Sequence, residues 1–294
     1  MSLKRPLEDS PHVLSVKDYY ANMFPVGHIT RWLYPSLPRL EIALWYSSGA
    51  VSRWRTFYNE GDLEKMLVKE GPVRIEIGAE YAGDPTEDRN EGVPVSRQLV
   101  FDIDVPDFDD LRTCKDEHLG ASTCSKCWKL IDVATRILDS LLRGMGFKHL
   151  LWVYSGNKGV HCWVCDPRAC ALDDRKREYI CNYLQTPQDH PVLDEMFPII
   201  QREQGLIETD PKVIWPRLDL HVSTQTKHLL KSPFCVHPKT GRICVPFDPE
   251  VGFDPTEGPT LGNLDLDPYL ELFDEFLERL NRATPSKDPC SFGT

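Results

Sequence analysis

The segment LVFDIDVPD, residues 99–107, places acidic residues inside an apolar stretch. Apolar residues alternate with Asp102 and Asp104, which predicts a β-strand carrying both carboxylates on one face. Two carboxylates at that separation repel each other unless positive charge compensates them, and divalent cations with oxygen ligands commonly do so. The bland alternative is a solvated strand end, but uncompensated charge inside an apolar run is costly. The fold must therefore accommodate an acidic strand, which indicates a candidate metal site.

A third carboxylate occurs much later in the chain, in PRLDLHV. Asp219 alternates with Leu218, Leu220 and Val222, and this alternation predicts a strand over residues 217–222. Three carboxylates on neighbouring strands are typical of two-metal sites for phosphoryl or nucleotidyl transfer.

The segment WVYSGNKGVHCWV predicts two strands, residues 149–155 and 159–165, joined by a tight turn. The turn brings together backbone amides, the Ser155 hydroxyl and Lys158, with His161 on the following strand. Such groups can cradle a triphosphate. A single histidine in a strand is usually structural, so His161 needs support from elsewhere in the chain.

A second basic segment, HLLKSPFCVHPKTGR, provides that support. It adds His228, Lys231 and His237 shortly after Arg217 and Asp219, and strands are predicted over residues 234–237 and 242–247. Histidines interleaved with lysine and arginine in two short segments favour anion binding close to the acidic site.

Cysteines cluster in one short segment, where Cys114, Cys124 and Cys127 enclose His118. Zinc in a structural role prefers four nitrogen or sulfur ligands in a closed tetrahedral site, so these four residues form the predicted zinc set. The alternative, unliganded thiols in a polar loop, is disfavoured because such a loop gains nothing from three reactive thiols.

The remaining patterns predict an α/β fold with a mixed sheet in which antiparallel pairs are common. Residues 1–14 read as a flexible arm. Helices are predicted from near Ser15 and over residues 62–70, 127–142, 173–184 and 268–281. Further strands are predicted over residues 40–46, 51–57, 74–79 and 98–105.

Composition limits the classes of function. The net charge of −11 excludes a general basic coat for nucleic acid, so any contact with DNA or nucleotide is expected to be local. No run of about 18 apolar residues occurs and the N-terminus lacks the apolar stretch of a signal peptide, from which we expect an intracellular location. Ten cysteines, with three in one cluster, suit a reducing compartment with one metal site.

Four stretches closely resemble the small catalytic subunit of archaeal/eukaryotic-type DNA primase, and its eukaryotic members in particular: LVFDIDVPDFDD, CSKCWKL, GFKHLLWVYSGNKGVHCWV and PRLDLHVSTQTKHLLKSPFCVHPKTGRICVP. The resemblance runs from about Tyr19 to the C-terminal helix. It implies the primase fold over residues 15–294, with a mixed β-sheet catalytic core, flanking helices and a zinc knuckle at residues 114–127. A helical subdomain is implied before the third acid, at about residues 173–213.

The resemblance also implies roles for individual residues. Asp102, Asp104 and Asp219 would hold two Mg²⁺ or Mn²⁺ ions for in-line nucleotidyl transfer, which makes short RNA primers on single-stranded DNA. The residues implied to contact the incoming nucleotide, the last three by weaker matches, are Ser155, Asn157, Lys158, His161, Arg217, Lys231, His237, Arg53, Glu41 and Glu76.

Three features depart from the pattern of the family. Asn157 and Lys158 stand where better-known members have two arginines, so Asn157 supplies no charge and Lys158 only a point charge. Lys115 follows Cys114 where the family often has a second cysteine, which makes His118 an inferred zinc ligand. The segment at residues 173–213 is shorter than the helical insert of the family.

The family further implies partners and a location. These are ribonucleoside triphosphates, a single-stranded DNA template with its RNA primer, a large regulatory subunit and the DNA polymerase alpha complex, in the nucleus. The residues alone leave two other classes open, a catalytically silent zinc-bearing scaffold and a two-metal nuclease. Retention of all three acids and of the basic cluster argues against the scaffold.

Overall fold

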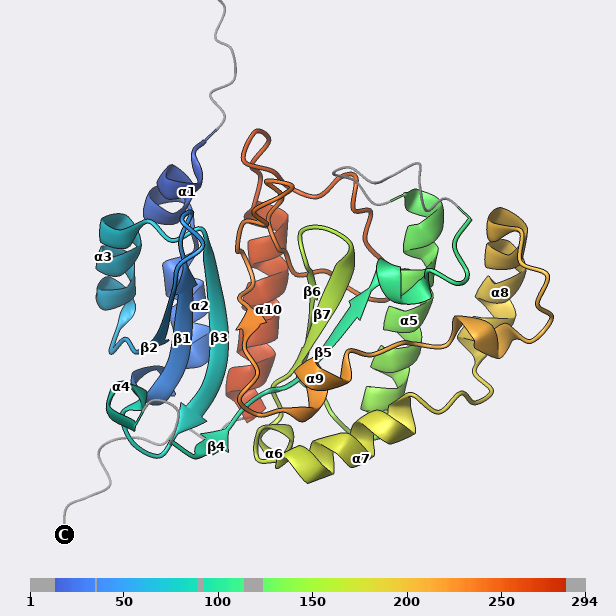
Figure 1. The fold of residues 1–294 in the computed structure, drawn as a ribbon, viewed down its shortest axis with the longest axis horizontal. Coiled ribbons are helices and arrows are strands. Elements are labelled where there is room, and N and C mark those ends of the chain that lie inside the picture. Colours follow the sequence, from blue (N-terminus) through green and yellow to red (C-terminus); the bar gives the residue numbers. More distant parts are fainter. Residues whose placement is uncertain (1–13, 35, 89–91, 114–123, 284–294) are drawn as a thin grey trace, which may run out of the picture.

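The computed structural model describes residues 14–34, 36–88, 92–113 and 124–283. Within these residues the strands form two sheets, one in each half of the molecule, with helices packed around them (Figure 1). Every strand pair within the two sheets is antiparallel. The predicted α/β class is confirmed, but where one mixed sheet was expected, the described strands build two antiparallel sheets.

The first sheet has the strand order β2-β1-β3-β4, and β8 also pairs with β3. Its strands are β1 (Leu40–Trp45), β2 (Val51–Arg55), β3 (Arg74–Tyr81), β4 (Pro94–Ser96) and β8 (Leu230–Lys231). The register of the last pair sets Glu76 opposite Lys231. Because residues paired in a ladder project from the same face, β8 brings a late basic residue next to an early acidic one.

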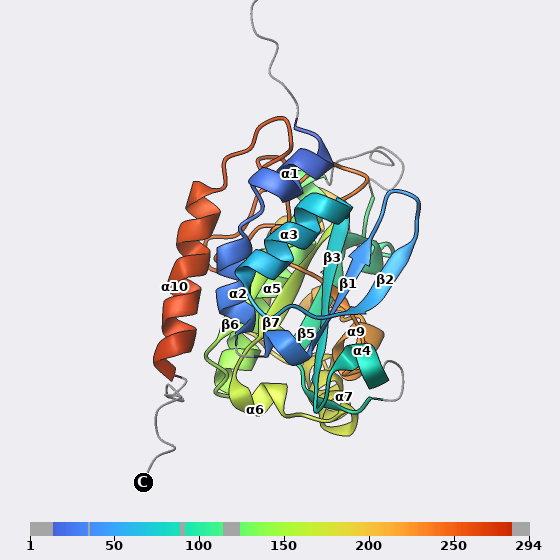
Figure 2. The ribbon, with the colours of Figure 1, turned by 90° about the vertical axis from the view of Figure 1, so that its left-hand side faces the viewer.

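Helices α1 (Val16–Asn22), α2 (Val26–Leu33) and α3 (Glu60–Glu70) lie over one face of the first sheet, and the short α4 (Pro85–Asp88) lies near its lower edge (Figure 2). Local sequence sets the bounds of α3. Asn59 caps its start, since Oδ1 accepts a hydrogen bond from the Asp62 amide at 3.0 Å, and the helix stops at a left-handed glycine.

The second sheet has the order β5-β7-β6, from strands β5 (Leu99–Asp104), β6 (Leu150–Tyr154) and β7 (Gly159–Val164). Helix α5 (Ser125–Gly144) packs against β5 and β7. Its apolar residues recur at helical spacing and are buried, as the sequence predicts. The alternating pattern of β5 and the hairpin of β6 and β7 are confirmed as well. The register between β5 and β7 decides which of their side chains face each other in the candidate site.

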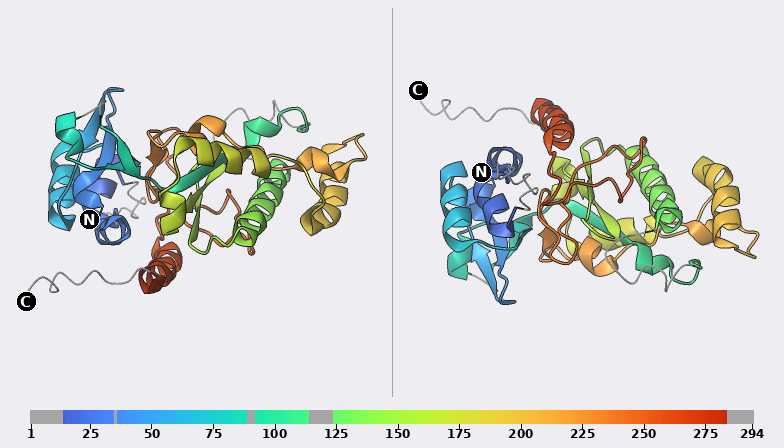
Figure 3. Two further views of the ribbon diagram at one scale, coloured as in Figure 1. Left: turned by 90° about the horizontal axis from the view of Figure 1, so that it is seen from below. Right: turned by 90° about the horizontal axis from the view of Figure 1, so that it is seen from above.

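The remaining helices are α6 (Pro167–Cys170), α7 (Asp174–Leu184), α8 (Pro191–Gln204), α9 (Leu220–Thr224) and α10 (Asp267–Ala283). Figure 3 shows α8 at one end of the molecule and α10 along one side. Short 3-10 helices occur at Leu37–Arg39, Val105–Phe108 and Pro211–Ile214. The segment expected to hold a shortened helical insert thus contains α7 and α8. None of the described helices combines the length and apolar character needed to cross a membrane.

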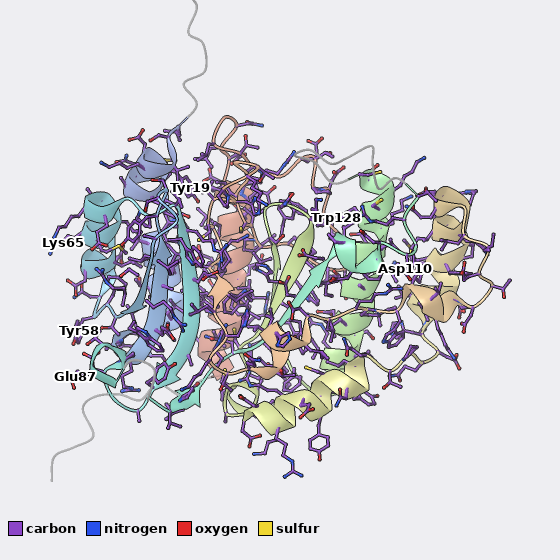
Figure 4. All side chains as sticks on the ribbon, viewed as in Figure 1. Tyr19, Tyr58, Lys65, Glu87, Asp110 and Trp128 are labelled. Carbon is purple, nitrogen blue, oxygen red and sulfur yellow. The ribbon has the colours of Figure 1, made fainter. Side chains whose placement is uncertain are left out.

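A shared core joins the two halves. Trp32 of α2 meets Trp163 of β7 edge to face, with ring centroids 5.0 Å apart. The hydroxyl of Tyr19 donates a hydrogen bond to the Phe234 carbonyl at 2.7 Å, which ties α1 to the chain after β8. Tyr19 and Trp128, labelled in Figure 4, lie in different halves of this core. The sheets are therefore held at a fixed separation, and the candidate site lies between them.

Three predicted strands are wrong. Residues 217–222 form no strand, because a short helix begins directly after Asp219. Residues 234–237 and 242–247 make only isolated bridges, such as Val236 with Ile243. The chain in this region passes close to the hairpin turn, and its amides bond to single carbonyls in place of a regular ladder.

Candidate active site

A cavity of about 280 Å³ lies between the two sheets. Its polar lining comes from five places in the fold, namely β3, β5, the β6–β7 turn, β7 and the segment around β8. The charged or hydrogen-bonding residues that line it are Arg74, Glu76, Asp102, Asp104, Ser155, Asn157, Lys158, His161, His228, Lys231 and His237. Most of the acidic and basic residues singled out in the sequence therefore meet at one place.

The acidic side of the cavity is formed by Asp102 and Asp104 on β5. The register sets Asp102 opposite His161 and Asp104 opposite Gly159. The backbone amide of Asp104 donates a hydrogen bond to the Asp107 carboxylate at 3.2 Å. Two carboxylates on one face, with a third beside them, concentrate negative charge at this end of the cavity.

Both β5 carboxylates resist ionisation in the metal-free chain. Burial, followed by repulsion from Asp104, raises the pKa of Asp102 well above its usual range. Burial and the charge of Asp107 raise the pKa of Asp104 to about 6. The charge of Lys231 lowers both pKa values, but not enough to offset the effects of burial and the neighbouring carboxylates. The pair thus lacks enough positive charge from the protein itself.

The nearby histidines do not supply that charge. His161 Nε2 lies 3.7 Å from Asp102 Oδ1, but burial together with Lys231 and Arg74 lowers the pKa of His161 well below its usual value. The same causes, with Lys239, lower the pKa of His237 to about 4. Both imidazoles are therefore neutral near pH 7 and act as hydrogen-bonding groups there.

The acidic pair fits a divalent cation. Asp102 Oδ1 is buried and has no hydrogen-bond partner among the described residues, so a compensating ligand is missing. No three His, Cys, Asp or Glu side chains in the described ranges are already gathered around one point. The fit to a cation therefore rests on the two β5 carboxylates alone, and Mg²⁺ is usually held by one or two carboxylates with water and phosphate oxygens completing its shell.

Asp219 lies beside β5 but not on a strand. Its amide donates a hydrogen bond to the Asp102 carbonyl at 3.1 Å. Its Oδ1 accepts from the amides of His221 at 2.8 Å and Val222 at 3.2 Å, as the N-cap of α9. Asp219 is exposed and outside the cavity lining, yet its charge contributes to the raised pKa values of both β5 carboxylates.

The basic side of the cavity is built around the hairpin turn. Lys231 Nζ donates a hydrogen bond to the Ser155 carbonyl at 2.6 Å, and the Ser155 hydroxyl accepts from the Gly159 amide at 3.2 Å. Gly156 has a φ of +84°, and a Cβ there would stand 2.7 Å from the His237 Cβ. Only glycine allows this turn to pack against the segment carrying His237.

Three predicted nucleotide contacts lie outside the cavity lining. Arg217 forms an ion pair with Asp110 at 2.5 Å and lies over the ring of Phe108. Arg53 Nε donates to the buried carboxylate of Glu41 at 2.7 Å. Neither arginine nor Glu41 reaches the cavity in this structure, whereas Glu76 does.

Arg74 and His228 also line the cavity. Arg74 was not singled out in the sequence, whereas His228 was placed among the anion-binding groups near the acidic site but not among the nucleotide contacts. His228 stands in the basic segment whose pattern was recognised, so its neighbours were a usable signal. Arg74 had only one weak signal, its position two residues before Glu76 on a predicted strand.

The predicted zinc set is only partly within the described residues. Cys114 and His118 lie outside them. Cys124 is the N-cap residue of α5, and Cys127 is buried in the first turn with Gln204 Nε2 at 4.0 Å from its sulfur. The zinc site stays a prediction.

Comparisons with known proteins bear on the identity of this site. The family model described as DNA primase small subunit matches residues 101–249, which include most of β5, the hairpin and the basic segment. The DNA primase small subunit of Schizosaccharomyces pombe is 32% identical, over 84% of this chain and 76% of its own length. That of Drosophila melanogaster is 30% identical, over 84% of this chain and 79% of its own.

The alignment with the S. pombe protein extends over 346 positions, which exceeds the 294 residues of this chain. That relative therefore carries residues that this chain lacks. The fold resembles the solved polymerase domain from Mycobacterium tuberculosis Ligase D in complex with DNA, with a TM-score of 0.50 over 91% of this chain and 88% of that one. At 14% identity this likeness concerns the fold alone. By its sequence matches, the chain belongs to the DNA primase small subunit family.

Proposed function

We propose that this chain is a template-directed nucleotidyltransferase that joins ribonucleotides into short RNA primers on single-stranded DNA. One observation carries the proposal: a single cavity brings a half-buried carboxylate pair together with Lys158, Lys231 and two neutral histidines. A metal-bound triphosphate needs both kinds of group within a few ångströms of each other.

In this proposal Asp102 and Asp104 hold two divalent cations, with Asp219 completing the acidic set. When bound, the cations would neutralise phosphate charge and favour ionisation of the primer 3′-hydroxyl. The protein orients the triphosphate through Lys158, Lys231 and the β6–β7 turn, so that the α-phosphorus faces the primer in line with the leaving pyrophosphate.

The neutral histidines have a separate task. His161 and His237 offer N–H groups to phosphate oxygens without adding charge, because their lowered pKa values keep them unprotonated at neutral pH. The ring nitrogen Nδ1 of His161 is buried with no hydrogen-bond partner among the described residues, so His161 is not committed to a structural hydrogen bond through that atom.

The family relationship supports three further proposals. The chain works with a large regulatory subunit and the DNA polymerase alpha complex, it acts in the nucleus, and one structural Zn²⁺ is held by Cys114, His118, Cys124 and Cys127. A net charge of −11 agrees with an enzyme whose template is held largely by partners.

The test is incorporation of labelled ribonucleotides on a primed single-stranded template with Mg²⁺ or Mn²⁺. We expect extension by the unchanged chain and none by the double variant Asp102→Ala, Asp104→Ala. A two-metal nuclease would instead shorten end-labelled DNA when nucleotides are left out. A silent scaffold would show neither extension nor metal-dependent nucleotide binding, and either result would overturn the proposal.

A further inference from the structure

Arg74 is the cavity residue whose role the sequence patterns did not indicate. It lies on β3 two residues before Glu76, so both side chains project from the same face of the strand. It lines the cavity together with Lys158, Lys231 and His237. Arg74 thus lies among the basic groups of the cavity, next to Lys231 of the same sheet and together with Lys158 from the hairpin of the second sheet.

The guanidinium of Arg74 is positioned by its neighbours, but not all of its hydrogen-bond donors have partners among the described residues. It donates to Glu76 Oε1 and lies over the Trp45 ring, 4.6 Å from the centroid. Glu76 Oε2 accepts from Trp45 Nε1 at 2.7 Å, so the three side chains form one group. Arg74 Nε is buried and has no hydrogen-bond partner among the described residues. The side chain as a whole keeps 30% of its surface exposed and lines the cavity, so an acceptor from outside the chain can approach it there.

Arg74 lies close to a second cation. Lys231 lies opposite Glu76 in the ladder, which makes Lys231 a diagonal neighbour of Arg74 on the same face. Lys231 also acts on the β5 carboxylates, so Glu76 is not its only acidic neighbour. Both cations act on His161 and His237, whose pKa values they help to lower. An anion beside Arg74 would reduce the repulsion between these two cations.

The hairpin turn leaves room for such a role, because its Asn157 is neutral and Lys158 is its only charged residue. We propose that Arg74 binds a phosphate group of the incoming nucleoside triphosphate and supplies from β3 the charge that Asn157 does not supply from the turn. A guanidinium suits this task because it can donate two parallel hydrogen bonds to one phosphate. The inference rests on the proposed function and names a further residue of its nucleotide site.

The experiment measures binding and needs no turnover. A non-hydrolysable ribonucleoside triphosphate and the corresponding monophosphate are titrated with Mn²⁺ into the full chain. We expect Arg74→Gln to weaken triphosphate binding about 10-fold to 100-fold, as for loss of a charged hydrogen bond, with a much smaller effect on the monophosphate. The triphosphate affinity of Arg74→Lys should lie between those of the unchanged chain and Arg74→Gln, since lysine keeps the charge but not the paired N–H donors of the guanidinium.

Two further variants separate binding from support. Asn157→Arg in the Arg74→Gln background should regain at least about fivefold in triphosphate affinity, because it restores the charge from the turn. Arg55→Gln is the matched control, since Arg55 on β2 pairs with Glu70 at 2.8 Å outside the cavity lining. That control should bind the triphosphate like the unchanged chain.

Several outcomes would overturn the inference. These are unchanged triphosphate affinity in Arg74→Gln, an equal loss for both ligands, or a triphosphate-selective loss of the same size in Glu76→Gln, which would make Arg74 a mere support for Glu76. Thermal unfolding checks that each variant folds. If Arg74→Gln does not fold, the triphosphate affinity of Arg74→Lys serves as the test instead. Failure of the unchanged chain to bind triphosphate would overturn the proposed function as well, whereas binding without polymerisation would contradict that function alone.

Discussion

Gly159 lies directly opposite Asp104 in the ladder of β5 and β7, and a Cβ on residue 159 would stand 1.9 Å from Asp104 Oδ1. It would also stand 2.3 Å from the carbonyl oxygen of Ile103. Neither oxygen belongs to the flexible end of a long side chain, so a larger residue would force β5 or the carboxylate to move. The absent side chain of Gly159 therefore helps to set the position of the Asp104 carboxylate.

We predict that Gly159→Ala lowers the rate of ribonucleotide incorporation at least about tenfold, because small displacements of a catalytic group are costly. It should also reduce the free energy of unfolding by about 1–3 kcal/mol through overpacking. Primer extension and urea unfolding measure the two effects. Gly144→Ala at the end of α5 is the control, since a Cβ there meets nothing within 4 Å. A normal rate in Gly159→Ala would contradict the account.

Removal of metal should separate the function of Asp104 from its effect on stability. With a chelator present, Asp104→Asn should be more stable than the unchanged chain by about 1–2 kcal/mol near pH 8, since burial and Asp107 both disfavour the charge. Mn²⁺ should then raise the melting temperature of the unchanged chain and barely change that of the variant. Differential scanning calorimetry tests this, and equal stabilisation of both proteins by Mn²⁺ would oppose it.

Asp132 on α5 should produce a pH dependence of stability unrelated to the cavity. Burial raises its pKa from the usual 3.8 to about 7, against the opposing effect of Arg136 and Lys129. Between these values the folded chain holds a proton that the unfolded chain has lost, so the free energy of unfolding falls as pH rises from about 4 to about 7.

Asp132→Asn removes this dependence. The variant should match the stability of the unchanged chain near pH 4 and exceed it by about 1–3 kcal/mol at pH 8. This range is smaller than the free energy that the whole pKa shift would imply, because solvent screens the partly buried Asp132 carboxylate. Urea unfolding at a series of pH values gives the difference between the two proteins. A difference that does not grow with pH would show that Asp132 is ionised in the folded chain at no cost.

The proposed zinc site predicts both metal content and local stability. The purified chain should contain one zinc ion, and Cys124→Ser should lose it, since structural sites need all four ligands. Because Cys124 is the residue at the N-cap position of α5, loss of zinc should increase amide exchange in the first turns of that helix. Elemental analysis and hydrogen exchange give the two readouts, with Cys181→Ser on α7 as a buried-cysteine control. Zinc retained in Cys124→Ser would exclude Cys124 as a ligand.

Local patterns predicted the parts of the fold in which neighbouring residues decide the structure. The alternation in β5, the glycine turn between β6 and β7 and the helical spacing in α5 each have a short-range cause, and all three are confirmed. Asp219 shows the limit of such patterns. Apolar residues alternate around it, but its carboxylate caps α9 through two amides, and this local capping outweighs the strand pattern.

Long-range packing explains what else the sequence left open. Residues 98–105 and 74–79 were both expected to be strands, but nothing in their sequences places them in separate sheets. Lys231 joins Arg74 and Glu76 in the cavity because the two-residue strand β8 pairs with β3 and sets Lys231 opposite Glu76, a long-range pairing that no local pattern indicates. Arg217 was expected near the nucleotide from the resemblance to the primase family, but in this structure it pairs with Asp110 and lies outside the cavity lining.

The central claim is that the cavity gathers two divalent cations and a triphosphate between β5 and the basic segment. The most direct test is the number of Mn²⁺ ions bound per chain with a non-hydrolysable ribonucleoside triphosphate, measured by electron paramagnetic resonance of free Mn²⁺. We predict two ions for the unchanged chain and none at comparable concentrations for the double variant Asp102→Asn, Asp104→Asn. Equal Mn²⁺ binding by the two proteins would contradict the account.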